Sequence, residues 1–150
     1  MERRRKRLFN TYFKINDNKH ILVYNYDDEF YLVSNGISLL KIKKTDDLVV
    51  NTDKKDMGKL LNYLKSFETD YTDYGKRIKS DFEEESIIAK YKDNKEYSVD
   101  KDLLDNVSNI ILPTSDIKVL ENTINYIQCV VYMENKNTRE KAYILPIRVF

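Results

Sequence analysis

The sequence predicts an α+β fold in which an antiparallel β-sheet is backed by two or three helices. Short runs rich in β-branched and aromatic residues occur in groups, and single stretches with helical periodicity separate these groups. The chain has 150 residues, and a domain of that length can bury a large share of its surface in one core. We therefore expect residues 1–150 to form a single domain.

A basic, amphipathic helix is expected over residues 2–14. Its apolar positions, Leu8, Phe9, Tyr12 and Phe13, recur with helical spacing and form one stripe. Basic side chains are concentrated before this stripe, at Arg3, Arg4, Arg5, Lys6 and Arg7. Because the net charge of the whole chain is only +1, this positive charge is local.

Three strands of an antiparallel meander are expected next, over residues 21–26, 30–33 and 37–43. These runs are β-branched and aromatic, as strands commonly are. An acidic turn joins the first two, and Asn35-Gly36 is a typical tight turn before the third.

Residues 53–67 show the clearest helical pattern. Apolar residues at i, i+3, i+4 and i+7 form one stripe, namely Met57, Leu60, Leu61 and Leu64. Thr52 or Asp53 is the expected N-cap. The stretch 68–85 is polar, which predicts a loop. The adjacent carboxylates in it, Glu83 to Glu85, cannot converge on one cation, so we expect a solvated segment and no metal site.

The second half predicts further strands around one more helix. Residues 86–92 and 97–99 have strand composition, and Asp100 is placed to cap a helix. The apolar stripe of that helix consists of Leu103, Leu104 and Val107. Strands are expected over 124–133 and 142–149, and the proline in the last run favours an edge strand or a strand end.

Sequence motifs typical of catalysis or of cofactor binding are missing from the sequence. P-loop, dinucleotide-binding, zinc-protease and serine-hydrolase patterns are absent, and three glycines are too few for a phosphate-binding loop. Cys129 is the single cysteine and His20 the single histidine, which excludes an intrachain disulfide, a Cys-based zinc site and a histidine pair. We expect a buried, inert Cys129 and an exposed His20. A non-enzymatic binding protein without cofactor or metal is predicted.

Hydropathy and composition bear on location and origin. No apolar run approaches the roughly 20 residues that cross a bilayer. The basic start is not followed by the apolar stretch of a signal peptide, so we expect a cytoplasmic protein with no membrane partner. Alanine is scarce while Lys, Asn, Ile and Tyr are abundant, which suggests an AT-rich genome such as that of a low-GC bacterium or its phage.

Three stretches share a pattern with one known family. Residues 29–40 run from a strand through Ser34-Asn35-Gly36 into an apolar strand, residues 97–104 step from strand to helix, and residues 142–149 end in an apolar-Pro-apolar-Arg sequence. These stretches resemble one domain of the DNA sliding clamps, the ring-shaped processivity factors of replicative polymerases, and in particular the bacterial β-type clamps and their phage relatives. The first match is one of pattern, since clamps have a Thr-Asp-Gly-type turn there.

The resemblance implies paired β-α-β-β-β units, with helices facing DNA and sheets outside. It also implies client proteins of DNA replication that dock by short peptides near the C-terminal strand. By that analogy a client pocket would be bordered by Ile144, Leu145, Pro146 and Ile147. Clamp chains carry two or three such domains and close a ring with six, so a single domain implies a possible homo-oligomer.

Three hypotheses for function follow. The first is a DNA-associated, clamp-like binding protein in which Arg3, Arg4, Arg5, Lys6 and Arg7 contact phosphates. The second is a small phage-type effector or inhibitor that binds a host protein, favoured by the many tyrosines. The third is a general RNA- or DNA-binding protein that uses the Arg-rich segment alone. A solvated, partly frayed terminus is the structural alternative for that segment.

Overall fold

A computed structural model describes residues 2–15, 21–45, 48–78, 86–90, 96–123 and 128–148, and for 86–90, 96–97 and 147–148 it describes the backbone alone. Within these residues the helices and strands, in chain order, are α1 (Arg3–Ile15), β1 (Leu22–Asn25), β2 (Phe30–Ser34), β3 (Ser38–Lys43), α2 (Lys54–Thr69), β4 (Tyr71–Arg77), β5 (Ser86–Lys90), β6 (Glu96–Asp100), α3 (Lys101–Ile111), β7 (Lys118–Asn122), β8 (Cys129–Asn135), β9 (Glu140–Ile144) and β10 (Ile147–Arg148).

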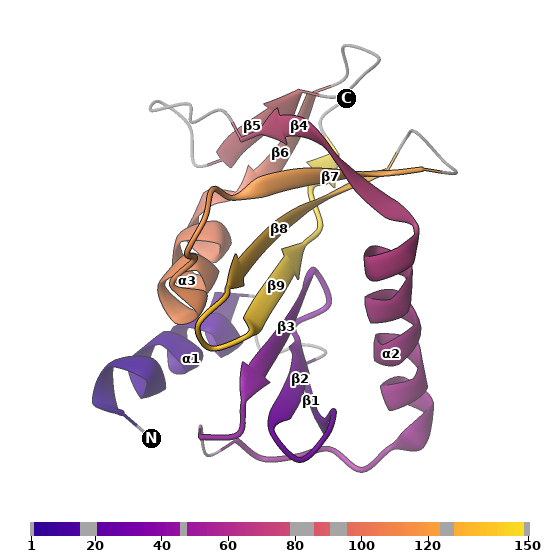
Figure 1. Ribbon diagram of the computed structural model, residues 1–150. Helices are drawn as coiled ribbons and strands as arrows, with labels where there is room; N and C mark the ends of the chain where they lie inside the picture. The colour runs from indigo at the N-terminus through magenta and orange to yellow at the C-terminus, as the bar shows by residue number, and fades with distance from the viewer. Residues whose placement is uncertain are drawn as a thin grey trace.

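The described strands form two antiparallel sheets. The larger has seven strands in the order β1-β2-β3-β9-β8-β7-β4, and the smaller has the order β10-β6-β5. α1 and α3 cover one face of the large sheet, and α2 covers the opposite face (Figure 1). The predicted α+β fold with an antiparallel sheet is therefore confirmed, and helices lie on both faces of that sheet.

Alternation along the strands explains why both faces of the sheet are covered. Neighbouring side chains of a strand point to opposite faces, and here both sets are apolar. Leu39 and Tyr143 pack beneath α2, whereas Leu40 and Ile144 pack beneath α1 and α3. A strand that is apolar on both faces has to be covered twice, which the three helices accomplish.

The large sheet contains the same arrangement twice. α1 is followed by the meander β1-β2-β3, and α3 is followed by the meander β7-β8-β9. The last strands of the two units, β3 and β9, pair with each other at the centre, so the strand order is symmetric outward to β1 and β7. α1 and α3 pack side by side on one face (Figure 1).

The predicted helices are confirmed with small shifts of their ends, and their N-caps follow the expected chemistry. The Asp53 carboxylate accepts a hydrogen bond of 2.9 Å from the backbone N–H of Lys55, so Asp53 and not Thr52 caps α2. The Asp100 carboxylate accepts one of 3.1 Å from Leu103 at the start of α3. Each carboxylate binds an N–H that has no partner inside its helix.

The prediction of a loop over 68–85 is wrong for residues 71–77, which form β4. This strand is an edge of the large sheet and is mostly exposed, so its polar sequence carries no alternation that would reveal it. Gly75 has a φ of +88° beside a break in the pairing with β7, a conformation that favours glycine. Glu83 to Glu85 and His20 lie outside the described residues.

Two other differences concern the last third of the chain. β7 was not predicted, because its sequence Lys-Val-Leu-Glu-Asn offers only two apolar residues. The run predicted as one strand over 142–149 is divided between two sheets: β9 ends at Ile144, and β10 begins at Ile147 and pairs with β6 in the small sheet. Leu145 and Pro146 connect the two, which agrees with the expected strand end at the proline.

Candidate functional site

The outer surface of α1 carries the basic residues singled out by the sequence. Arg3, Arg4, Lys6 and Arg7 are exposed, and within the described residues none of them is in an ion pair. The first turn of α1 contains no acidic residue. Because the N-terminal end of a helix has a partial positive charge, four cations placed there repel it and one another.

Arg5 has a different role from its neighbours. Its Nη1 and Nη2 atoms donate hydrogen bonds of 3.2 and 2.9 Å to the two carboxylate oxygens of Glu140, a side chain only 2% exposed. One of those oxygens also accepts a hydrogen bond of 3.0 Å from the backbone N–H of Lys43. The guanidinium group of Arg5 lies over the ring of Phe9. Arg5 therefore ties α1 to the central strands, which leaves Arg3, Arg4, Lys6 and Arg7 as the exposed cations.

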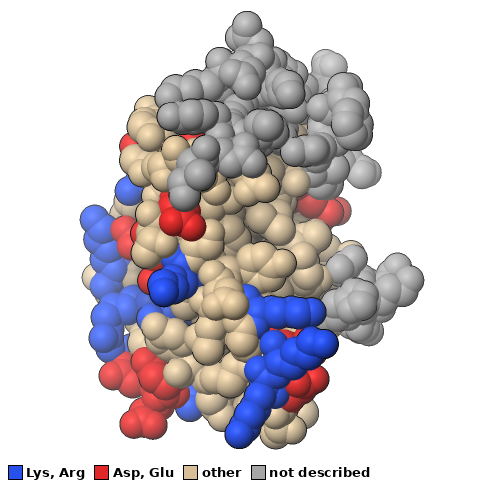
Figure 2. Space-filling view, turned by 90° about the vertical axis from the view of Figure 1, so that its right-hand side faces the viewer, with Lys and Arg blue, Asp and Glu red and all other residues tan. Residues whose placement is uncertain are grey.

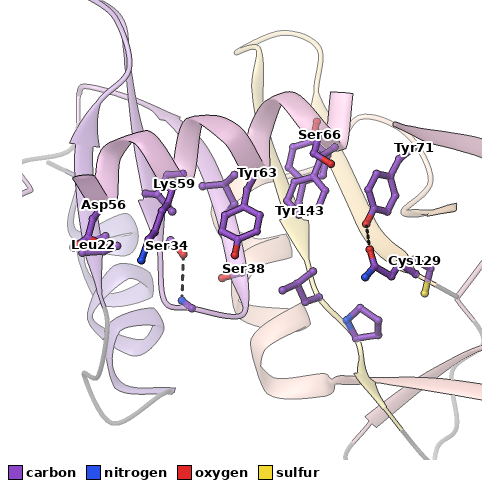
Figure 3. Close-up of a pocket in the computed structure, with 17 residues that line it drawn as sticks. Leu22, Ser34, Ser38, Asp56, Lys59, Tyr63, Ser66, Tyr71, Cys129 and Tyr143 are labelled. Atoms are coloured by element: carbon purple, nitrogen blue, oxygen red, sulfur yellow. Dashed lines mark hydrogen bonds between the residues drawn. The ribbon is translucent and has the colours of Figure 1, made fainter. Parts of the chain in front are cut away.

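On the opposite side of the sheet, a groove of about 880 Å³ lies between α2 and the strand ends (Figure 3). Most of its lining is uncharged, and Asp56 and Lys59 are the charged residues that border it. The apolar and aromatic lining residues are Leu22, Leu39, Leu60, Tyr63, Phe67, Tyr71, Tyr143, Leu145 and Pro146. Figure 2 views the molecule from the α2 side, where uncharged residues occupy the centre and charged ones lie mainly toward the margins.

Aromatic side chains give this groove both a firm floor and an exposed rim. Phe67 and Tyr143 stack with ring centroids 4.8 Å apart, and burial raises the pKa of the Tyr143 hydroxyl well above its usual value, so it stays neutral. Tyr63 points from α2 into the open space (Figure 3), and its side chain is 58% exposed. Leu145, 41% exposed, lines the same groove. Exposed apolar side chains in a concave site favour binding of another apolar group.

Two of the four residues predicted to border a client pocket lie in this groove. Leu145 and Pro146 line it, in the connection between the two sheets. The prediction is wrong for Ile144, which is fully buried and faces α1 and α3 across the sheet. The side chain of Ile147 is outside the described residues. The opposite wall, formed by α2, was not predicted from the sequence.

Cys129 also lines the groove but is unsuited to chemistry. It is buried as predicted, and burial raises the pKa of the thiol to about 12, with the carboxylate of Glu121 adding to that effect. The thiolate needed for nucleophilic attack is therefore negligible at neutral pH. The described residues contain no group of three or more metal-ligating side chains, and among them no helix is long and apolar enough to cross a bilayer.

Comparison with protein-family models, with curated proteins and with solved structures finds no match to this chain.

Functional inference therefore depends on the two surfaces described above. One is the exposed basic surface of α1, and the other is the aromatic groove beneath α2. They lie on opposite faces of the large sheet, so both can be occupied at the same time.

Proposed function

We propose that this chain is a non-catalytic, DNA-associated binding protein of the cytoplasm with a clamp-like domain. The observation that carries the proposal is the group of four exposed cations on α1, Arg3, Arg4, Lys6 and Arg7, none of which is in an ion pair within the described residues. Folding gains nothing from this arrangement, because cations at a helix N-terminus oppose the helix dipole. An external polyanion would remove that repulsion.

The repeated helix-and-meander arrangement supports the clamp-like part of the proposal. The resemblance implies paired units whose helices share one face, and α1 and α3 lie together on one face of the large sheet. The basic surface belongs to that helical face. Contacts from arginine and lysine to phosphates are independent of base sequence and fall steeply with salt, as suits a protein that stays on DNA without a specific site.

Replacing Arg3, Arg4, Lys6 and Arg7 together by glutamine is expected to weaken DNA binding and to flatten its salt dependence. Each lost phosphate contact removes close to one unit from the slope of log affinity against log salt concentration. Fluorescence anisotropy of a labelled oligonucleotide over a salt series measures both quantities. All four side chains are exposed, so the fold should be unaffected.

A matched control variant removes four positive charges from residues outside α1. Lys54, Lys55, Lys65 and Lys136 are exposed and lie off α1, and their replacement by glutamine should leave most of the slope intact. If the two quadruple variants lose affinity and slope equally, binding follows net charge alone and the basic surface of α1 has no special part in it.

The groove beneath α2 favours a second candidate function, an effector or inhibitor that binds a host protein. A peptide offering two or three apolar side chains would fit between Tyr63 and Leu145, both exposed at the groove. Micromolar binding of such a peptide corresponds to about −8 kcal/mol. The same groove would serve a replication client under the clamp-like proposal, so the identity of the partner separates the two functions.

A photoreactive residue at position 145 tests the groove. We expect one cross-linked partner, lost when Tyr63→Glu places a charge in the groove, and absent when the photoreactive residue replaces the exposed Leu112 at the end of α3. A replication protein as partner supports the clamp-like function, and a host enzyme or defence protein supports the effector. Equal capture from positions 145 and 112 would contradict a specific role for the groove.

A further inference from the structure

A smaller pocket, of about 360 Å³, lies beside α1 at the edge of the large sheet. One wall is α1 and the other is the segment Leu48 to Asn51, which precedes α2. Most of the lining is apolar, and the polar residues Lys6 and Asn10 border it from α1. A volume of this size is at the lower end of the range of about 300–1,000 Å³ in which proteins bind small organic groups.

The wall opposite α1 is held in place by the edge strand. The side-chain oxygen of Asn51 accepts a hydrogen bond of 2.7 Å from the N–H of Val23, and the N–H of Asn51 donates one of 2.7 Å to the carbonyl of Val23. These two hydrogen bonds resemble the pairing of a neighbouring strand with β1, and they hold the segment just before Asn51 in place. Val49, two residues before Asn51, is 91% exposed, more than any other large apolar residue described.

Aromatic rings form the other side of the pocket. Phe9 is buried and provides the floor. Phe13 is only partly buried, and its ring centroid lies 6.1 Å from that of Phe9 and 5.8 Å from that of Tyr12. Packing against two other rings holds Phe13 in place, so it offers a fixed aromatic surface to whatever enters the pocket.

One of the four exposed cations of α1, Lys6, lines this apolar pocket. Helical spacing places Arg3, Arg7, Asn10 and Lys14 along one side of α1, at i, i+4, i+7 and i+11, and Asn10 of that row lines the pocket together with Lys6. A row of cations beside an aromatic pocket is the arrangement by which proteins hold single-stranded nucleic acids: phosphates contact the cations and bases stack on the rings.

We infer that this pocket receives an unpaired nucleobase, and hence that the nucleic acid bound along α1 is single-stranded. The inference rests on the proposed function and specifies its ligand. In a duplex the bases are stacked inside, and taking one out requires it to be unstacked and unpaired at a cost in free energy. A single strand presents its bases without that cost, so one base can enter between Phe13 and Val49 while flanking phosphates lie on Lys6 and its neighbours.

The test compares three labelled ligands of equal length by fluorescence anisotropy: oligothymidine, the same strand carrying abasic sites, and a duplex. We expect the intact strand to bind about tenfold more tightly than the abasic strand, since stacking of a base on an aromatic side chain typically changes affinity by about five- to 150-fold. The Phe13→Leu variant, which keeps an apolar side chain but removes the ring, should lose this preference and bind the abasic strand as the unchanged protein does.

A second variant, Val49→Gln, changes a side chain that packs on little else and should also reduce the preference for the intact strand. A folding defect would weaken the binding of all three ligands together, so it can be recognised in the same experiment. Equal binding of intact and abasic strands, or tighter binding of the duplex, would overturn the base pocket while leaving the phosphate contacts in place. Binding to anionic phospholipid vesicles but to no oligonucleotide would overturn both the pocket and the proposed function.

Discussion

Replacing Glu140 by glutamine is expected to lower the free energy of unfolding by about 3 kcal/mol or more. The Glu140 carboxylate is almost fully buried at the start of β9 and binds two guanidinium nitrogens of Arg5 and the N–H of Lys43. Glutamine has nearly the same shape but removes the negative charge, so the partly buried guanidinium is left without its counter-charge. Losing one partner of a buried ion pair typically costs about 3–5 kcal/mol.

Urea denaturation measures this loss as a lower midpoint with an unchanged slope. A matched control is Glu68→Gln. Glu68 is likewise in an ion pair, with Lys141 at 2.6 Å, but its side chain is 41% exposed, and surface pairs contribute only about 0–1 kcal/mol. Similar losses in the two variants would mean that the Arg5–Glu140 pair is not what holds α1 to the sheet.

Replacing Leu104 by alanine should destabilise the protein by about 2–5 kcal/mol. Leu104 is 3% exposed in the core between α3, α1 and the sheet, and its truncation leaves a cavity that close-packed neighbours fill only in part. Thermal or urea unfolding of the variant gives the value directly.

Leu61 on α2 provides the comparison. It belongs to the apolar stripe that the sequence predicts for this helix, but it is only partly buried. Leu61→Ala should therefore cost about 1–2 kcal/mol, less than a full burial would imply. A greater loss at position 61 than at position 104 would show that α2, and not α3, contributes the better-packed helix face.

The sequence predicted the elements whose pattern is strong and local. The stripe Leu60 and Leu64 on α2, and the stripe Leu103, Leu104 and Val107 on α3, recur at helical spacing, and all five side chains are buried. β4 and β7 were missed because the features that mark them as strands depend on residues far away in the sequence. β4 is an exposed edge, and in β7 the fully buried Glu121 is compensated by Lys76, which lies 2.8 Å away on β4.

The candidate sites show the same limit. The resemblance of the C-terminal stretch to clamp sequences singled out Leu145 and Pro146, but the opposite wall of their groove comes from α2, and tertiary packing alone brings Tyr63 and Phe67 there. Helical spacing places Arg5 four residues before Phe9, on the apolar side of α1, but the sequence does not identify its ion-pair partner. Its distinct role depends on Glu140, which is 135 residues away along the chain.

The symmetric strand order of the large sheet has a consequence for the surface charge of its two halves. Two helix-and-meander units joined through β3 and β9 have the arrangement of a two-fold dimer contained in one chain. In a true homodimer every surface residue occurs twice, so both helices would carry the same charge. Within one chain that constraint does not apply: α1 exposes arginines and lysines, whereas α3 exposes Asp102 and Asp105. The two halves thus share one architecture but present surfaces of opposite charge.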